Sequence, residues 1–191
     1  MPRYCGGLTA SDAEVGKTLA VKNAKRLLSS AKLLLKSGDS ASALSLAVLA
    51  VEEQGKIEII DRILKAGINT PELKTTWDHY RTHTSKTSEF ISMYAELKGA
   101  SEGKACDFQM QNEDLLPLFD LMKQLGFYSD CTGNARWHDP HCISPAIAIA
   151  VVSAAEKIIS GAIQPDFATF LLALKELKSS SRRKDDIIPK R

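Results

Sequence analysis

The hydrophobic and polar positions of this chain repeat with helical periodicity over most of its length. The most apolar stretch is residues 41–51 (ASALSLAVLAV), where nearly every side of a helix would be apolar or small. Such a helix is enclosed by other helices rather than lying on a surface. A turn sequence, SGDS, precedes this stretch and Gly67 follows it. We therefore predict a central helix over residues 41–66.

Five further segments have the same periodicity. Residues 11–36 begin with a Ser11-x-x-Glu14 capping box. Residues 70–98 begin with Thr70-Pro71 and have a weak point in their threonine-rich middle. The other segments are 113–125, ending at Gly126, a helix restarting at residues 144–145, and 166–177. Strand patterns and internal repeats are absent, so we predict an all-α, antiparallel bundle of about five to six helices.

The remaining stretches define the expected domain limits. We predict one helical-bundle domain over residues 11–178, a flexible leader over 1–10 and a disordered tail over 179–191. Hydrophobic residues make up 44% and charged residues 25% of the chain, as in soluble globular proteins. The four cysteines are widely spaced and form no CxxC, which favours a reducing compartment. The longest apolar run is too short to cross a bilayer, so we expect a cytoplasmic protein without a membrane partner.

One acid lies within the apolar stripe of the central helix. At 3.6 residues per turn, Glu53 shares a face with Leu49 and Ile57. A carboxylate in such a place is costly unless cations or several donors meet it. We therefore expect Glu53 to meet a cation of the third helix, either Arg81 or Lys86.

A simpler interpretation of the same region stays open. The apolar stripe would then drift to the surface beyond Val51. Glu52 and Lys56 would form an ion pair one turn apart, which stabilises a helix by only about 0.2–0.5 kcal/mol.

Three blocks of the sequence resemble one known family. They are NAKRLLSSAKLLLKSGDSASALSLAVLAVEEQGK, a mid-chain YRTHTSK, and a later KQLGFYSD followed by a Trp and Asp-Pro. Together they resemble the AbiV abortive-infection family of the HEPN helical-bundle superfamily over about residues 20–160. The resemblance implies a HEPN-like helical fold, a homodimer and a role in phage defence with shut-off of translation. It also implies metal-independent cleavage of RNA, since many HEPN proteins use an Arg and a His four to six residues apart.

The resemblance also indicates candidate site residues. The Arg-x-His-x-x-Lys pattern of AbiV-like sequences is matched by Arg81, His83 and Lys86, and the later Tyr-x-Asp by Tyr128 and Asp130. The usual HEPN spacing is matched only by Arg136 and His141, which lie in the irregular stretch 127–143 and are secondary candidates.

The chemistry of RNA cleavage gives these residues roles. Attack by a 2′-hydroxyl needs a base that works near neutral pH and cations that hold the phosphate. His83 would be the base or acid, and Arg81 and Lys86 would stabilise the charge on phosphorus. Arg81 lies roughly 200° from His83 on an ideal helix, so both reach one phosphate only if the helix is broken there or a second subunit contributes. The alternative is a polar helix face without a catalytic role.

We expect no metal and no cofactor. Cys131, His138, His141 and Cys142 are suitable zinc ligands, but they lack the paired Cys-x₂₋₄-Cys spacing of a structural zinc site. The partners implied are a second copy of the chain, RNA such as tRNA or rRNA, and a phage-encoded protein. The alternative function is a non-catalytic module that senses a phage or host protein and blocks translation by association.

Overall fold

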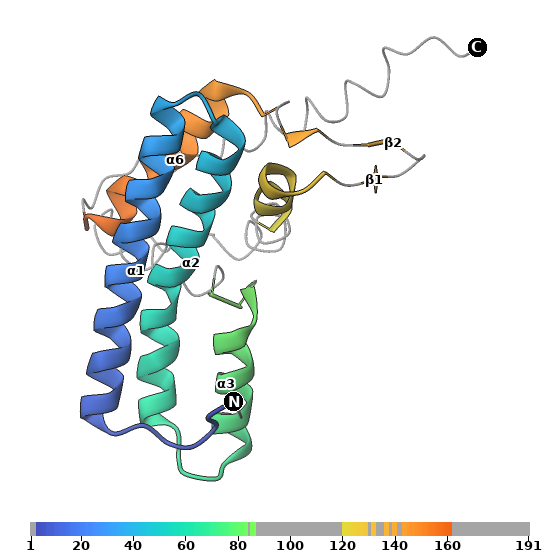
Figure 1. Cartoon of the computed structure of the whole chain (residues 1–191). Helices are drawn as coiled ribbons and strands as arrows, with labels where there is room; N and C mark the ends of the chain where they lie inside the picture. The colour runs from blue at the N-terminus through green and yellow to red at the C-terminus, as the bar shows by residue number, and fades with distance from the viewer. Residues whose placement is uncertain are drawn as a thin grey trace, which may run out of the picture.

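The computed structural model describes residues 3–83, 85–86, 120–129, 131–132, 136–137, 139–140 and 143–161. Its helices are α1 (Ala10–Lys36), α2 (Ser40–Lys65), α3 (Pro71–Arg81) and α6 (Pro145–Ile159), and residues 120–127 are also helical. Figure 1 shows α1 and α2 side by side, with α6 against their upper part and α3 beside the lower part of α2. The predicted all-α bundle is confirmed.

The hairpin of α1 and α2 is fixed by its caps. Thr9, not Ser11, caps α1: its side chain accepts from the backbone of Asp12, whose carboxylate accepts from the backbone of Thr9. The predicted box at Ser11 is therefore wrong by two residues, although both pairs have the same spacing. Between the helices, Gly38 has φ 88°, a conformation that favours glycine, and Asp39 caps α2 through the backbone N–H of Ser42.

The main core lies between α1, α2 and α6. It is rich in alanine, which lets helix backbones approach closely, and larger side chains from α2 and α6 fill the remaining space. A second, smaller cluster joins the end of α2 to α3 through Ile59, Ile63 and Leu73, with Leu8 of the N-terminal segment packed against it.

Helix α3 ends much earlier than residue 98. Thr82 leaves the helix with φ −90° and ψ 130°, while its backbone N–H and its hydroxyl both donate to the carbonyl of Asp78 and close the last turn. Residues 83, 85 and 86 are helical again. The predicted weak point therefore exists and is a break between Arg81 and His83; the predicted continuation over residues 87–98 lies outside the described residues.

The helical segment 120–127 packs closely on α2. Gly126 lies inside this helix, not at its end, so the predicted stop there is wrong. A Cβ at Gly126 would come within 2.1 Å of Ser45 Oγ and 2.4 Å of the carbonyl oxygen of Ala41. Glycine is needed here because two helices touch, and this contact brings the segment against α2.

The rest of the predicted irregular stretch holds a small pairing. Strands β1 (Cys131–Thr132) and β2 (Arg136–Trp137) pair antiparallel, two residues each. Helix α6 then begins with Pro145 at its first turn, as predicted. The final segment 166–177 and the tail lie outside the described residues, and the domain limits stay predictions. In the described part of the chain, no helix is both long and apolar enough to cross a membrane.

Candidate functional site

The site is built on one face of α2. Ala41, Ser45, Leu49 and Glu52 lie three or four residues apart and so share a side of the helix. Ala41 meets Gly126, and the hydroxyl of Ser45 donates to the carbonyl of Lys123 at 3.1 Å. The segment 120–127 therefore runs antiparallel to α2. This arrangement brings the side chain of Lys123 to Glu52, one to two turns farther along α2.

Glu52 is the buried acid of this face. Its side chain is 4% exposed, and both carboxylate oxygens are bound. Oε2 lies 2.6 Å from His83 Nδ1, and Oε1 lies 3.2 Å from Lys123 Nζ. Because an ionised carboxylate can only accept, Nδ1 carries the hydrogen of this bond. Glu52 thereby joins three elements: α2, the turn that follows α3, and the segment 120–127.

Lys123 is held by two carboxylates. Its side chain is 8% exposed, and Nζ also lies 2.8 Å from Asp120 Oδ1, one turn earlier on the same helix. Burial by itself would lower the pKa of Lys123, but the hydrogen bonds and charges of Asp120 and Glu52 outweigh it and raise that pKa. Lys123 is therefore a fixed positive charge at neutral pH.

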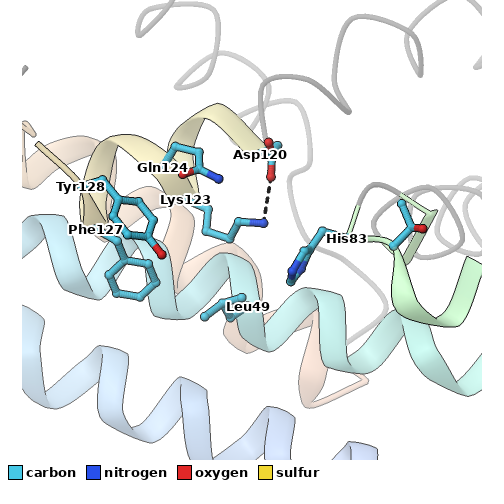
Figure 2. A pocket seen from close by; sticks show the side chains of 8 residues that line it. Leu49, His83, Asp120, Lys123, Gln124, Phe127 and Tyr128 are labelled. Carbon is cyan, nitrogen blue, oxygen red and sulfur yellow. Dashed lines mark ion pairs between the residues drawn. The ribbon is translucent and has the colours of Figure 1, made fainter. Parts of the chain in front are cut away.

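A pocket of about 480 Å³ opens beside this network. Figure 2 shows His83, Lys123 and Asp120 at one end, Phe127 and Tyr128 at the other. Leu49, Thr82 and Gln124 complete the lining. The imidazole of His83 is 54% exposed, so it can meet a ligand in the pocket while Glu52 holds its Nδ1. A carboxylate that binds one ring nitrogen fixes the tautomer and the orientation of an imidazole.

Glu52 and Glu53 differ from the sequence predictions in the residues that they bind. Glu53 pairs with Lys56 at 2.5 Å, and each of these side chains is 17% exposed. The ion pair of Glu53 is thus with its own helix and not with Arg81, but the charge of Glu53 does act on Lys86, whose pKa it acts to raise. The alternative pair of Glu52 with Lys56 is not formed, because Glu52 binds His83 and Lys123. The buried acid that binds side chains from other elements is Glu52, through His83 and Lys123.

Lys86 is buried and is not among the described residues that line the pocket. It is 7% exposed, and burial lowers its pKa, assisted by the charges of Lys56 and Lys123 and opposed by those of Glu52 and Glu53. Lys86 therefore belongs to the same group of charges as the predicted site. Its place suits balancing the two carboxylates better than touching a ligand.

Arg81 points to a different part of the molecule. Its guanidinium donates to the carbonyl of Tyr4 at 2.7 Å, lies 3.6 Å from Asp78 and stacks over the ring of Trp77. The break at Thr82 could have turned Arg81 toward His83, but the N-terminal segment holds it instead. Residues of the predicted flexible leader thus contact α3, and Arg81 fastens them there.

The other candidates divide into two groups. Tyr128 follows the segment 120–127 directly and lines the same pocket as His83, and its role there stays a prediction. Asp130, His138, His141 and Cys142 lie outside the described residues. For Arg136 and Cys131, in β2 and β1, the structure describes the backbone alone. Within the described residues, no three His, Cys, Asp or Glu side chains are placed to hold a metal ion.

Lys123 is the residue of this charged network that the sequence did not reveal. It is 71 residues from Glu52, and no spacing rule connects them. One local signal was present: Gly126 follows Lys123 by three residues, on the same side of the predicted helix, and a glycine within a helical pattern can mark a close packing contact. That signal places Lys123 on a contact face but does not name its partner.

The geometry can be compared with known proteins. The family profile described as AbiV (HEPN_AbiV) matches residues 12–160. The chain belongs to the AbiV family. This assignment confirms the resemblance, and AbiV proteins of the HEPN type have a role in abortive infection, a form of phage defence. Comparison with curated proteins and with solved structures finds no match.

The AbiV match covers every residue of the Glu52–His83–Lys123 network. It includes α2, α3, α6 and all but the first two residues of α1, so the helices that build the pocket are those of the family domain. HEPN domains commonly dimerise. The pocket described above comes from one chain.

Proposed function

We propose that this AbiV-family protein acts in the cytoplasm as a metal-independent ribonuclease that lowers translation during phage infection. The observation that supports the proposal is the pair of Glu52 and His83 at the edge of a pocket that also holds Lys123. A base held by a buried carboxylate and a cation beside it are what cleavage through a 2′-hydroxyl requires.

In this mechanism His83 acts through Nε2 while Nδ1 stays bound to Glu52. Nε2 takes the proton of a ribose 2′-hydroxyl, the 2′-oxygen attacks the adjacent phosphorus, and the bond from phosphorus to the 5′-oxygen breaks. The products are a 2′,3′-cyclic phosphate and a 5′-hydroxyl, whose proton comes from water. His83 then returns its proton to solvent. Glu52 stabilises the imidazolium that forms during the step.

Lys123 takes the role that the sequence assigned to Arg81 and Lys86. Its ammonium lies at the charged end of the pocket and is fixed by Asp120 and Glu52, so it can stabilise charge on the phosphate without reorganising. Lys86 keeps the buried carboxylates neutralised. Arg81 holds the N-terminal segment against α3.

The test is cleavage of tRNA and ribosomal RNA by the purified protein, with and without EDTA. We expect cleavage that EDTA does not abolish, with 2′,3′-cyclic phosphate ends. His83→Ala should lower the rate at least 100-fold. His79→Ala is the matched control, because His79 lies one turn earlier, on α3, and outside the pocket lining. Equal activity of the two variants, or no cleavage by the wild type, would contradict the proposal.

A second candidate function is a non-catalytic module that binds a phage-encoded or host protein. Exposed apolar side chains favour it: Leu121 is 47% and Trp137 77% exposed. In that case His83→Ala should keep translation blocked in a cell-free system, whereas loss of the bundle through a core substitution should abolish it.

We also propose that the protein acts as a homodimer, as HEPN domains commonly do. Sedimentation equilibrium of the full chain should then give twice the mass of 20.9 kDa. A monomer at micromolar concentration would refute this part without affecting the chemistry of the pocket.

A further inference from the structure

The pocket has two chemically different ends. His83, Lys123 and Asp120 form the charged end, and Phe127 and Tyr128 form the aromatic end, with Leu49 between them (Figure 2). The mechanism above uses only the charged end. The aromatic end is therefore available to recognise another part of the ligand.

The two rings cannot both lie flat on one ligand. They are 6.3 Å apart and inclined at 75°, so one can present a face where the other presents an edge. Tyr128 is 57% exposed and Phe127 38% exposed, which makes Tyr128 the ring with more open surface. An exposed aromatic ring beside a phosphate-binding group is a platform on which a nucleobase stacks.

This platform is held in place before a ligand arrives. The backbone N–H of Tyr128 donates to the carbonyl of Gln124 at 3.0 Å, which continues the ladder of the helical segment. That segment is in turn seated on α2 by Gly126 and by the bond from Ser45 to Lys123. Rigid placement lowers the entropy lost on binding.

The charged end limits the amount of phosphate that the pocket can hold. Among the described residues at this end, the ammonium of Lys123 is paired with two carboxylates, Glu52 and Asp120, so no surplus positive charge remains to attract a long polyanion. Duplex binding usually relies on several such cations. A single phosphodiester fits this end better than a triphosphate or a helical backbone.

We propose that the pocket takes one unpaired nucleotide of an RNA strand, with its base on Tyr128 and Phe127 and its phosphodiester at His83 and Lys123. This inference rests on the proposed ribonuclease function and names its substrate class: single-stranded or looped RNA. Bases inside an A-form duplex keep their faces stacked, so they cannot reach the platform unless they leave the helix.

The test is binding of a fluorescent single-stranded 2′-O-methyl RNA of about 12 nucleotides to the wild-type protein. This probe cannot be cleaved, so binding is measured whether or not the protein is a ribonuclease. Anisotropy should show at least tenfold weaker binding of the same strand in a duplex. The matching single-stranded DNA should bind within about threefold of the RNA, since stacking does not use the 2′-hydroxyl.

Variants of Tyr128 test whether the aromatic end of the pocket binds the single strand. Tyr128→Leu should weaken binding of the single strand roughly ten- to hundredfold, and Tyr128→Trp should preserve it. Tyr4→Leu is the matched control, because Tyr4 is 61% exposed and packs on Trp77, outside the pocket lining. A nucleoside 3′-monophosphate as competitor separates free nucleotides from RNA strands: it should displace the strand only at concentrations at least tenfold higher.

Each outcome bears on one proposal. Equal loss with Tyr128→Leu and Tyr4→Leu, or equal binding of single strand and duplex, would refute the platform. Displacement by the monophosphate at the concentration of the strand would assign the pocket to free nucleotides instead of RNA. Selective binding of the single strand without cleavage of unmodified RNA would support the aromatic platform and refute the ribonuclease proposal. Cleavage that Tyr128→Leu leaves unchanged would support the ribonuclease and refute the platform.

Discussion

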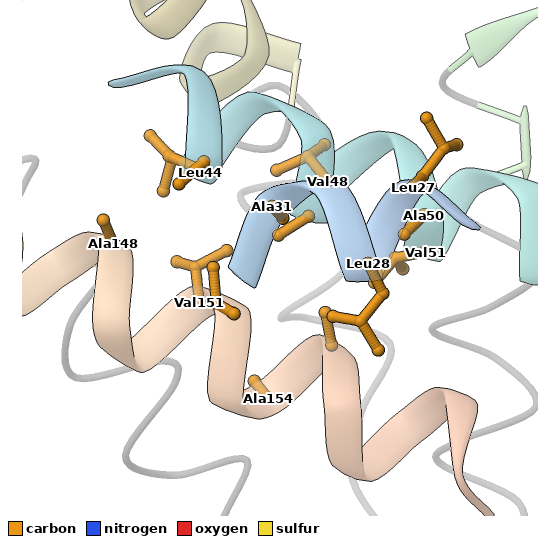
Figure 3. Close-up of a cluster of buried hydrophobic side chains, with 14 of the residues drawn as sticks. Leu27, Leu28, Ala31, Leu44, Val48, Ala50, Val51, Ala148, Val151 and Ala154 are labelled. Carbon is orange, nitrogen blue, oxygen red and sulfur yellow. The ribbon is translucent and has the colours of Figure 1, made fainter. Parts of the chain in front are cut away.

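Helix α2 contributes to two contact regions of opposite character. Toward α1 and α6 it presents Leu44, Val48 and Val51 among buried alanines, and Figure 3 shows these side chains meeting those of α1 and α6. Toward the segment 120–127 it presents Ser45 and Glu52, which bind Lys123. The first region is held by apolar packing. In the second, two polar bonds and one close glycine contact add to the burial of Met122 in the same core.

The difference teaches how one helix can be both scaffold and site. Apolar packing is nondirectional and tolerates small shifts, so it sets the positions of whole helices. A buried carboxylate bound at both oxygens is directional, and losing one partner leaves an uncompensated charge. We therefore expect the apolar region to set stability and the polar region to set the geometry of the pocket.

The largest expected effect is in the apolar region. Leu44→Ala should lower the free energy of unfolding by about 2–5 kcal/mol, because Leu44 is fully buried where α2 meets α6 and a cavity would remain. Leu33→Ala on α1 is the control: Leu33 is 64% exposed and should change stability by less than about 0.5 kcal/mol. Urea denaturation measures both, and similar losses would mean that this core is assigned to the wrong face.

The next effect compares the two glutamates of the polar region. Glu52→Gln should cost about 1.5–3 kcal/mol, since it weakens charge-assisted bonds to His83 and Lys123 in a buried place. Glu53→Gln removes a half-buried pair with Lys56 and should cost at most about 1 kcal/mol. Thermal unfolding of the two variants decides the order, and the opposite order would restore Glu53 as the central acid.

Substitution of Gly126 should lower stability less than the two changes above, but it should displace the side chains of the pocket. Gly126→Ala places a methyl group against Ser45 and Ala41, which should cost about 1–3 kcal/mol and push Lys123 away from Glu52. Gly16→Ala is the control, since a Cβ there meets only Ile60 methyl groups at 3.4 Å or more. RNA binding by Gly126→Ala at a temperature where it stays folded should fall; unchanged binding would show that the segment need not touch α2.

The apolar region could be predicted from the sequence, and the polar region only in part. Residues 10–36 and 40–65 carry caps, a turn glycine and long helical periodicity, so the hairpin followed from local rules. The rotation of α2 about its own axis did not follow from local rules, because residues 41–51 are apolar on almost every side and fit several orientations. Adjacent residues on a helix differ by about 100°. Placing the inward face of α2 one residue too far along the helix therefore made Glu53, instead of Glu52, the predicted buried acid.

The partners of the polar region depend on contacts between distant parts of the chain. Glu52 meets Lys123 only because Gly126 seats one helix on another, and Arg81 leaves the site because the carbonyl of Tyr4 accepts from it. Spacing rules describe neighbours along one helix, and these contacts join residues 71 and 77 positions apart. The break at Thr82 had a local signal in the threonines at positions 82, 84 and 87, and Gly126 was a local signal for the helix contact.

The smallest expected effect is on the pH dependence of stability, to which the buried lysines Lys123 and Lys86 should contribute with opposite signs. The pKa of Lys123 is raised from its ordinary 10.5, so its contribution to stability is complete below that pH and is lost as pH rises through the higher folded value. The pKa of Lys86 is lowered from 10.5, so its charge costs stability at low pH, and this cost disappears as pH rises through the lower folded value toward 10.5. Urea denaturation between pH 7 and 11 should therefore show two distinct changes. Lys123→Met should remove a fall in stability above about pH 10.5, and Lys86→Met should remove a rise below it. Identical profiles of stability against pH for the two variants would mean that both ammonium groups have the same environment. The assignment of Lys123, and not Lys86, as the fixed charge of the pocket would then be refuted.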